Sequence, residues 1–218
     1  MSATDVEARA RQSLGRSHEA IYSTVDRVLA ECGAGGTFAD IGCGAGDLWR
    51  LVGPRFARCI GIDAVRYEGL PDEIDFRPAD LDTGRLPIAD GSADVAAAVE
   101  VIEHLENPRA LVRELVRVVR PGGWIVVTTP NQLSVLSLLT LLLKGRFSAF
   151  QENAYPAHRT ALLEVDLHRI ATECRLRDVS IEFTCHGRVP FMPWHYPRAI
   201  TRFSPRRLSD NIVMAARR

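Results

Sequence analysis

The stretch FADIGCGAGDL at residues 38–48 decides the fold of this chain. An apolar run leads into Asp40, then into three glycines spaced two residues apart, and then into a helical pattern. This order predicts a strand, a tight glycine turn and the start of a helix. A glycine turn leaves bare backbone for a ligand, because any Cβ would fill that space. The helix behind the turn directs its free N–H groups and its positive dipole end toward the same ligand.

The spacing of the glycines favours a ligand other than a dinucleotide. The dinucleotide fingerprint GxGxxG, begun at Gly42 and Gly44, needs a third glycine at position 47, where the chain has Asp47. The third glycine is Gly46, one residue early. Asp40 at the strand end would repel a pyrophosphate and suits an ammonium group. An ordinary glycine-rich turn between a strand and a helix is the alternative.

The pattern DxGxGxG resembles the first motif of class I S-adenosylmethionine (SAM) methyltransferases. In that family the glycine turn lies against the methionine and ribose portions of SAM. The resemblance therefore implies SAM as the cofactor and a binding turn made by Asp40, Gly42, Cys43, Gly44 and Gly46.

Length and composition indicate one soluble α/β domain. The chain has 218 residues, of which 46% are hydrophobic and 25% are charged, as in an ordinary globular protein with a sizeable core. Its net charge is zero, so no overall field argues for a nucleic-acid partner. From residue 186 onward there are seven arginines and one acid. That segment is either a solvated face or a surface for an anionic substrate or membrane.

Cysteine usage and the first residues favour a cytoplasmic protein. The five cysteines are an odd number without a CxxC pair, and Cys43 and Cys59 fall in apolar surroundings. They are expected to be free thiols in a reducing compartment. Residues 1–5 are polar and acidic, and no apolar run reaches the ~20 residues that span a bilayer. We expect neither a signal peptide nor a transmembrane segment.

Strand and helix patterns alternate along the chain and predict a doubly wound α/β sheet. Strands are expected at residues 37–42, 59–63, 74–78, 93–99, 124–129, 179–185 and 211–216. Helices are expected at 4–32, with a second segment capped by Ser17, from Asp47, after Asn107 and after Thr160. The resemblance to class I methyltransferases implies a Rossmann-like sheet of seven mostly parallel strands. It also implies that the last strand is antiparallel and lies inside the sheet.

Four acidic side chains fall at the carboxyl ends of predicted strands, where doubly wound sheets bind ligands. They are Asp40, Asp63, Asp80 and Glu100, and we expect all four to contact the cofactor. An acid about 20 residues past the glycine turn accepts hydrogen bonds from ribose hydroxyls, which suits Asp63. The resemblance implies that Asp80 binds the adenine amino group and that Leu81 lies against the ring.

His104 is the first candidate base for methyl transfer to a hydroxyl. It lies just past the strand at 93–99, where the acceptor would reach the cofactor, and a histidine titrates near neutral pH. A helix-terminal histidine that only hydrogen-bonds the backbone is the alternative.

The segment Glu100-x-x-Glu103-His104 resembles ubiquinone-pathway O-methyltransferases and small-RNA 2′-O-methyltransferases. In the latter, two glutamates and two histidines bind a divalent metal, and His158 lies at about the place of the second histidine. The resemblance implies a catalytic pair of His104 and His158, and a metal site of Glu100, Glu103, His104 and His158. Many relatives carry the same segment with no known use of a metal.

The chain is expected to form one methyltransferase domain without internal repeats. Its parts are a helical cap at 1–36, a SAM-binding core at 37–131, an apolar insertion or lid at 132–157, and a C-terminal half at 158–218 with an aromatic and arginine-rich insertion at 186–208. The leucine-rich run at 133–143 ends in Lys144 and Arg146. It is either a helix buried as a lid or an element that lies on an anionic membrane surface.

Together these patterns predict a SAM-dependent methyltransferase that acts on an oxygen of a small molecule, a lipid-linked intermediate or a glycan. Transfer to nitrogen or carbon is the first alternative. A SAM-fold protein without catalysis, serving as partner to another enzyme, is the second, although the intact glycine turn argues against it. RNA is not expected as the substrate, because the chain lacks the size and the RNA-binding domain of the small-RNA enzymes. The sequence leaves the acceptor and the oligomeric state open.

Overall fold

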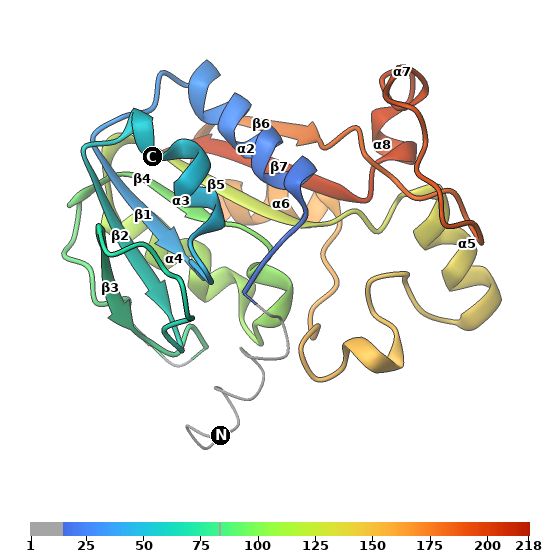
Figure 1. The fold of residues 1–218 in the computed structure, drawn as a ribbon, viewed down its shortest axis with the longest axis horizontal. Helices are drawn as coiled ribbons and strands as arrows, with labels where there is room; N and C mark the ends of the chain where they lie inside the picture. Colours follow the sequence, from blue (N-terminus) through green and yellow to red (C-terminus); the bar gives the residue numbers. More distant parts are fainter. Residues whose placement is uncertain (1–14, 83) are drawn as a thin grey trace.

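A computed structural model describes residues 15–82 and 84–218. Seven strands of these residues form one sheet in the order β3-β2-β1-β4-β5-β7-β6 (Figure 1). Strand β7 pairs antiparallel with β5 and β6, whereas the other ladders are parallel. This confirms the predicted sheet with an internal antiparallel last strand. The strands are β1 Thr37–Ile41, β2 Arg58–Asp63, β3 Ile74–Pro78, β4 Ala93–Ala98, β5 Val119–Pro130, β6 Arg177–Phe183 and β7 Asn211–Arg217.

Helices cover both faces of the sheet (Figure 1). One face carries α2 Glu19–Glu31 and α3 Asp47–Val52, and the other carries α4 Pro108–Val118 and α6 Glu164–Glu173. Successive side chains of a strand point to opposite faces, so Phe38 joins one core cluster and Ala39 joins the other. The remaining helical elements are α5 Val135–Lys144, α7 Arg198–Thr201, α8 Pro205–Leu208, and the short 3-10 turns η1 Gly53–Arg55, η2 Ile102–His104 and η3 Glu152–Ala154.

The start of α4 agrees with the sequence. Asn107 is its N-cap, and the side chain of Asn107 accepts a hydrogen bond from the Ala110 N–H. Pro108 occupies the first turn, where its missing N–H costs nothing. The local sequence therefore predicts the start of α4 correctly.

The predicted caps of two other helices are wrong. Helix α2 is capped by His18, whose Nδ1 accepts from the Ala20 N–H, and not by Ser17. Residues 4–14 of the predicted helix lie outside the described residues. Helix α6 begins after Leu163, three residues beyond Thr160. The Thr160 hydroxyl donates to the Leu105 carbonyl oxygen, a tertiary contact that competes with capping.

Helix α5 turns leucine side chains outward. Its buried side chains are polar, Ser137 and Thr140, whereas Leu142 is 80% and Leu143 is 67% exposed. Of the two alternatives for 133–143, the buried helix holds only in part, because Leu142 and Leu143 at the end of α5 are exposed. In the described part of the chain, no helix has both the length and the apolar character needed to cross a membrane.

All five cysteines are free thiols, as predicted. Cys43 and Cys59 are buried in the sheet region, and burial raises the pKa of both thiols. They are neutral packing residues, since a thiol is reactive only as the thiolate.

Candidate active site

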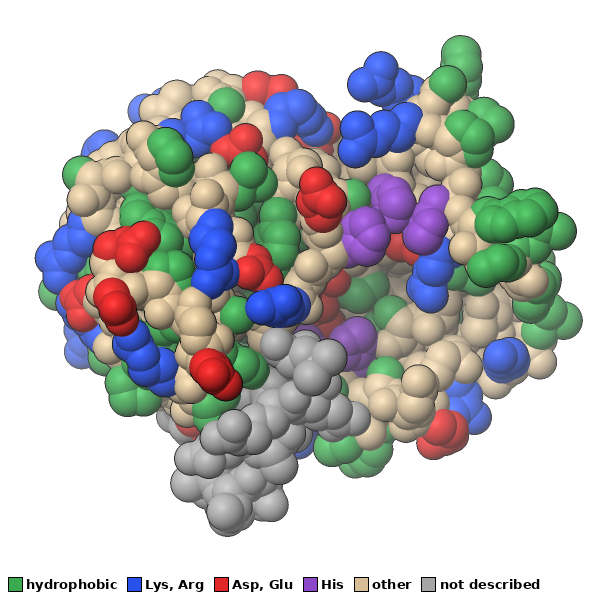
Figure 2. Space-filling view, in the orientation of Figure 1, with side chains coloured by type: hydrophobic (Ala, Val, Ile, Leu, Met, Phe, Trp, Pro, Cys, Tyr) green, Lys and Arg blue, Asp and Glu red, His purple; other side chains and the backbone are tan. Residues whose placement is uncertain are grey.

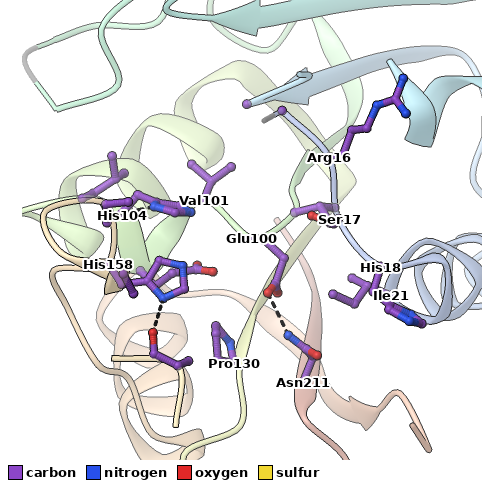
Figure 3. A pocket seen from close by; sticks show the side chains of 18 of the residues that line it. Arg16, Ser17, His18, Ile21, Glu100, Val101, His104, Pro130, His158 and Asn211 are labelled. Carbon is purple, nitrogen blue, oxygen red and sulfur yellow. Dashed lines mark hydrogen bonds between the residues drawn. The ribbon is translucent and has the colours of Figure 1, made fainter. Parts of the chain in front are cut away.

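A cavity of about 720 Å³ lies at the carboxyl ends of the parallel strands. Its walls come from the ends of β1, β2 and β4, from residues 15–22, from the loop 148–158, and from parts of the insertion 186–208. Figure 3 shows side chains from these separate segments around one space. The arginine-rich insertion reaches this mouth through His186, Arg188 and His195. Of the insertion expected at 132–157, the part from residue 148 onward lines the cavity, whereas α5 contributes no lining residue.

Asp40, at the end of β1, is a buried carboxyl group without a cationic partner. It is 2% exposed, and its Oδ2 has no hydrogen-bond partner among the described residues. Burial, followed by the charge of Asp63, raises the pKa of Asp40 to about 7. A cation at Oδ2 would stabilise the ionised form, because an opposite charge lowers a carboxyl pKa. The position fits the ammonium group expected from the sequence.

Asp63, at the end of β2, is oriented by the backbone of the glycine turn. Its Oδ2 accepts from the Gly44 N–H at 2.9 Å, and its Oδ1 accepts from the Ala64 N–H at 2.7 Å. Burial raises the pKa of Asp63, and these hydrogen bonds oppose the rise. Each carboxylate oxygen has a second lone pair, so the group can still accept from two hydroxyls. This is the geometry that a ribose diol requires.

Asp80 and Leu81 follow β3 and line the same cavity. The Asp82 N–H donates to Asp80 Oδ1 at 3.0 Å, so the local turn uses one of the two carboxylate oxygens. Cys43, within the glycine turn, also lines the cavity. The structure therefore brings the expected adenine, ribose and methionine positions into one space.

The packing of the protein itself requires the glycines of the turn. Gly42, Gly44 and Gly46 have φ values of 75°, 51° and 79°, a region that favours glycine. A Cβ on Gly42 would lie 2.3 Å from a Val101 methyl, and one on Gly44 would lie 2.1 Å from the Gly15 carbonyl oxygen. The sequence interpretation assigned the bare backbone to a ligand alone. The segment before α2 also packs on it, and the Ala45 N–H donates to Gly15.

Glu100, after β4, is tied to the antiparallel part of the sheet. The Thr128 hydroxyl donates to its Oε1 at 2.7 Å. The Asn211 amide donates to its Oε2, also at 2.7 Å (Figure 3). Burial raises the pKa of Glu100 to about 7, and these two hydrogen bonds oppose the rise. Glu100 also has a positive φ of 54°. Both carboxyl oxygens therefore have protein donors, from β5 and β7.

Glu103, His104 and His158 bring one ligand atom each to within 4.8 Å of one another. Glu103 is fully buried, and neither carboxyl oxygen has a hydrogen-bond partner in the described residues. Burial, followed by the charge of Glu100, raises the pKa of Glu103 well above its usual range. Three of the four residues expected to bind a metal thus converge, whereas Glu100 lies outside this group.

Backbone carbonyls fix the rings of both histidines. His104 Nδ1 lies 2.9 Å from the Ala157 carbonyl oxygen, and His158 Nδ1 lies 2.6 Å from that of Ala149 (Figure 3). A carbonyl only accepts, so Nδ1 is assigned the proton and the neutral ring keeps its lone pair on Nε2. The two rings meet edge to face, with centroids 4.8 Å apart.

Comparison with protein families matches residues 14–206 to the family described as "Methyltransferase domain". The chain belongs to this family. Its sheet order and its glycine turn are those of the class I SAM-dependent methyltransferases. SAM is therefore its cofactor, as the resemblance implied.

Relatives among known proteins include methyltransferases of several kinds. A probable SAM-dependent methyltransferase of Mycolicibacterium smegmatis is 35% identical over 124 residues, which are 55% of this chain and 46% of that protein. A ubiquinone biosynthesis O-methyltransferase of Chromobacterium violaceum is 30% identical over 122 residues, half of each chain. The chain thus matches about half the length of these relatives. A solved SAM-dependent methyltransferase from Archaeoglobus fulgidus shares the fold, with a TM-score of 0.68 and 18% identity over 95% of this chain and 97% of that one.

The cavity of this methyltransferase fits SAM. The orphaned Oδ2 of Asp40 offers a site for the cationic methionine end, and the oriented carboxylate of Asp63 offers a site for the ribose. Asp80 and Leu81, which were expected to contact the adenine, line the same cavity. When bound, SAM supplies a methyl group activated by its positively charged sulfur.

Sequence reasoning missed several residues of the cavity, and one of them was within reach. Asn211 begins β7, and an antiparallel strand starts at the edge where its parallel neighbours end. A polar first residue on that strand was therefore a signal. No such signal exists in the sequence for His186 and His195 of the insertion, because neither follows a predicted strand or helix at a defined spacing.

Proposed function

We propose that this methyltransferase transfers the methyl group of SAM to a hydroxyl oxygen of a small-molecule acceptor. The observation that carries the proposal is the pair of histidines whose Nδ1 atoms meet backbone carbonyls, because it presents Nε2 as the proton acceptor. The relatives named for ubiquinone biosynthesis support transfer to oxygen. So does the tocopherol O-methyltransferase of Arabidopsis thaliana, 36% identical over 103 residues.

The residues divide the work between the two ends of the cavity. Asp40 and Asp63 hold the cofactor, while His104 and His158 face the acceptor. As the new C–O bond forms and the C–S bond breaks, the hydroxyl proton passes to an imidazole Nε2. Burial lowers the pKa of His158, so this ring is neutral at neutral pH and ready to take a proton.

A divalent cation at Glu103, His104 and His158 is the second candidate role for this cluster. The two orphaned oxygens of Glu103 fit a cation, since a buried carboxylate without a partner is costly. Carboxylate and imidazole together suit Mg²⁺, Mn²⁺ or Zn²⁺. A metal there would lower the pKa of an acceptor hydroxyl and orient it, the work otherwise assigned to the bases.

Transfer of labelled methyl from SAM to quinone precursors, lipid extracts and nucleotide sugars tests the activity. We expect His104→Ala and His158→Ala to lower turnover by about 10²–10⁴-fold and to leave SAM affinity nearly unchanged. The matched control is His168→Ala, which removes an exposed imidazole from α6. Near-normal turnover in both active-site variants would overturn the base role. Loss of activity in EDTA that one divalent ion restores would show that the cluster binds a metal. Methylation of nitrogen or carbon in the product would overturn the proposed transfer to oxygen.

An exposed apolar surface beside the cavity supports a lipid-linked acceptor. Seven large side chains of α5 and of the 186–208 insertion form it: Leu142, Leu143, Phe191, Met192, Trp194, Ile200 and Phe203. Phe203 is 92% exposed, and Figure 2 shows hydrophobic side chains gathered on this side with basic ones nearby. Apolar and basic residues together favour an anionic bilayer surface, where each cation near the membrane contributes about 1 kcal/mol.

Flotation with anionic vesicles tests this surface. We expect binding at low salt, where electrostatic attraction is least screened, and loss of binding in the double variant Leu142→Ser and Phe203→Ser. The control is Leu51→Ser, which alters a half-exposed leucine on α3, away from this surface. Absence of binding at low salt would leave only a soluble acceptor.

A further inference from the structure

Three histidines from two distant parts of the chain meet at the rim of the cavity. They are His18, at the start of α2, and His186 and His195, from the insertion after β6. One ring nitrogen of each lies within 4.8 Å of the others. Histidine side chains gather beside the hollow in Figure 2, and Figure 3 labels His18 across the cavity from His104. The methyl-transfer chemistry does not use this group.

A hairpin holds two of the three rings in place. The Val189 N–H donates to the Trp194 carbonyl, the Tyr196 N–H donates to the Gly187 carbonyl, and Arg188 pairs with His195 in a short antiparallel bridge. His186 and His195 stand at the open end of this hairpin, with ring centroids 4.1 Å apart. The ring of His18 stacks on His186 with centroids 4.4 Å apart, and its centroid lies 6.1 Å from that of His195.

The nitrogen atoms of this stack are suited to a cation. His186 Nε2 is buried and has no hydrogen-bond partner among the described residues, although a buried polar atom normally has one. Burial, followed by His195 and His18, lowers the pKa of His186, which keeps this ring neutral. The guanidinium of Arg188 is already paired with Asp210 at 2.8 Å, and the charge of Arg198 also lowers the pKa of His186. An anion would need a donor here, whereas a metal needs the lone pair that a neutral imidazole offers.

We propose that His18, His186 and His195 form a binding site for a transition-metal ion of the Zn²⁺ type. Three imidazoles and one open position make a common tetrahedral zinc site. In such a site the ligand nitrogens are about 3.4 Å apart, as follows from Zn–N distances of about 2.0–2.1 Å. The present separation of up to 4.8 Å therefore closes by rotation of the two exposed rings, His18 and His195. The fourth position faces the mouth of the cavity.

Metal binding at His18 would replace a hydrogen bond that its ring accepts from the backbone. A neutral imidazole has a single lone pair, and in His18 the Nδ1 lone pair accepts from the Ala20 N–H at 3.2 Å. An ion on this ring therefore replaces the side-chain cap of α2. The loss of this cap is small beside the binding energy of a three-imidazole site.

The ion would join the two segments that close the mouth of the cavity. Residues 15–18 lie on the glycine turn, where Gly15 accepts from the Ala45 N–H, and the hairpin 186–196 forms the opposite wall. An ion that ties His18 to the hairpin holds the first segment over SAM. Metal and SAM should therefore bind with positive coupling, and each should raise the affinity of the other by the same factor.

Titration of the full-length, chelator-stripped protein with Zn²⁺ by calorimetry tests the site, with Co²⁺ absorption as a second readout of tetrahedral coordination. We expect His186→Ala and His195→Ala each to weaken Zn²⁺ binding at least tenfold, and His168→Ala to bind like the wild type. His195 is exposed, so its variant reports on the site even where His186→Ala perturbs folding, which circular dichroism checks.

His158→Ala separates this site from the Glu103, His104 and His158 cluster. Zn²⁺ binding retained in His158→Ala and lost in His195→Ala supports the proposal, whatever the methyl-transfer activity of either variant. Equal Zn²⁺ affinity in wild type and His195→Ala, or loss in His158→Ala alone, overturns it. For the coupling, saturating Zn²⁺ should tighten SAM binding about fivefold or more in the wild type and not in His195→Ala, and an unchanged SAM affinity would refute the link between the two segments.

Discussion

Replacement of Asp40 by Asn is the sharpest test of the cofactor site, because the carboxyl group is buried without a cation. Asp40 is 2% exposed and its Oδ2 lacks a hydrogen-bond partner in the described chain. Asn keeps the shape of the side chain and removes its charge. The substitution should therefore stabilise the protein without SAM and weaken SAM binding, two opposite effects of one change.

The gain in stability follows from the pKa. Burial raises the pKa of Asp40 from 3.8 to about 7, and each unit corresponds to about 1.4 kcal/mol. The ionised carboxylate therefore costs roughly 4 kcal/mol of folding free energy above about pH 7. The folded protein binds this proton more tightly than the unfolded chain, so wild-type stability falls as pH rises from about 4 to about 7. Asp40→Asn lacks this contribution. The difference in unfolding free energy between the variant and the wild type should therefore grow as the pH rises from about 4 to about 7.

The loss in SAM affinity has its own magnitude. A hydrogen bond between charged groups is worth about 1.5–3 kcal/mol, so SAM should bind about 10- to 150-fold more weakly to Asp40→Asn. The ammonium group pairs with the ionised carboxylate only. Wild-type affinity should therefore fall as the pH drops below about 7, while the affinity of Asp40→Asn should show no such fall.

Urea unfolding from pH 4 to 8 measures the first effect, and calorimetric titration with SAM measures the second. Buried Glu100 and Glu103 titrate alike in both proteins and cancel in the difference. The control is Asp72→Asn, an exposed acid in the loop before β3. If the difference in unfolding free energy between wild type and Asp40→Asn stays constant from about pH 4 to about pH 7, the reasoning is refuted. Such a result would mean that water solvates the Asp40 carboxylate.

Three further substitutions test the turn and the acidic cluster. Asp63→Ala should weaken SAM binding by about 1–3 kcal/mol in calorimetry, because the ribose loses its acceptors, and equal affinity would remove the assignment. Gly44→Ala should lower the unfolding free energy by about 1–3 kcal/mol, because its φ is 51° and its Cβ would meet Gly15. Gly33→Ala, where φ is 62° and no atom lies within 4 Å, is the matched control and should cost less. Glu103→Gln should change stability by less than about 1 kcal/mol, since burial raises the pKa of this carboxyl group and favours its neutral form; a loss of several kcal/mol would show it to be ionised.

The sequence was sufficient for those features that local patterns encode. The glycine turn, the acids at strand ends and the Asn107 cap each depend on a few consecutive residues with strong preferences. The position of Asp63 next to Gly44 followed because parallel strands place their carboxyl ends at one edge. These features bring the residues that were expected to bind the cofactor to one cavity.

Features that depend on tertiary contacts were out of reach. The most buried side chains of α5 are polar: Ser137 has partners inside, the Gln132 side chain and the Ser148 N–H, and hydropathy alone cannot anticipate such partners. Glu100 lines the cavity as expected, but it lies outside the group of Glu103, His104 and His158, and Thr128 and Asn211 donate to its two oxygens. In each case the outcome depends on hydrogen bonds between different segments of the chain, and the periodicity of the sequence does not predict such bonds.

The electrostatics of the cavity explain why this fold selects SAM over an anionic cofactor. Asp40, Glu100 and Glu103 are all buried, and burial raises the pKa of each. Among the described residues no arginine or lysine lowers any of these pKa values; the opposing interactions come from neutral groups such as Thr128 and Asn211. A pyrophosphate would add negative charge to this group and raise its cost further. The sulfonium and ammonium groups of SAM supply the missing positive charge, so the same burial that destabilises the empty cavity becomes a source of affinity for a cationic ligand.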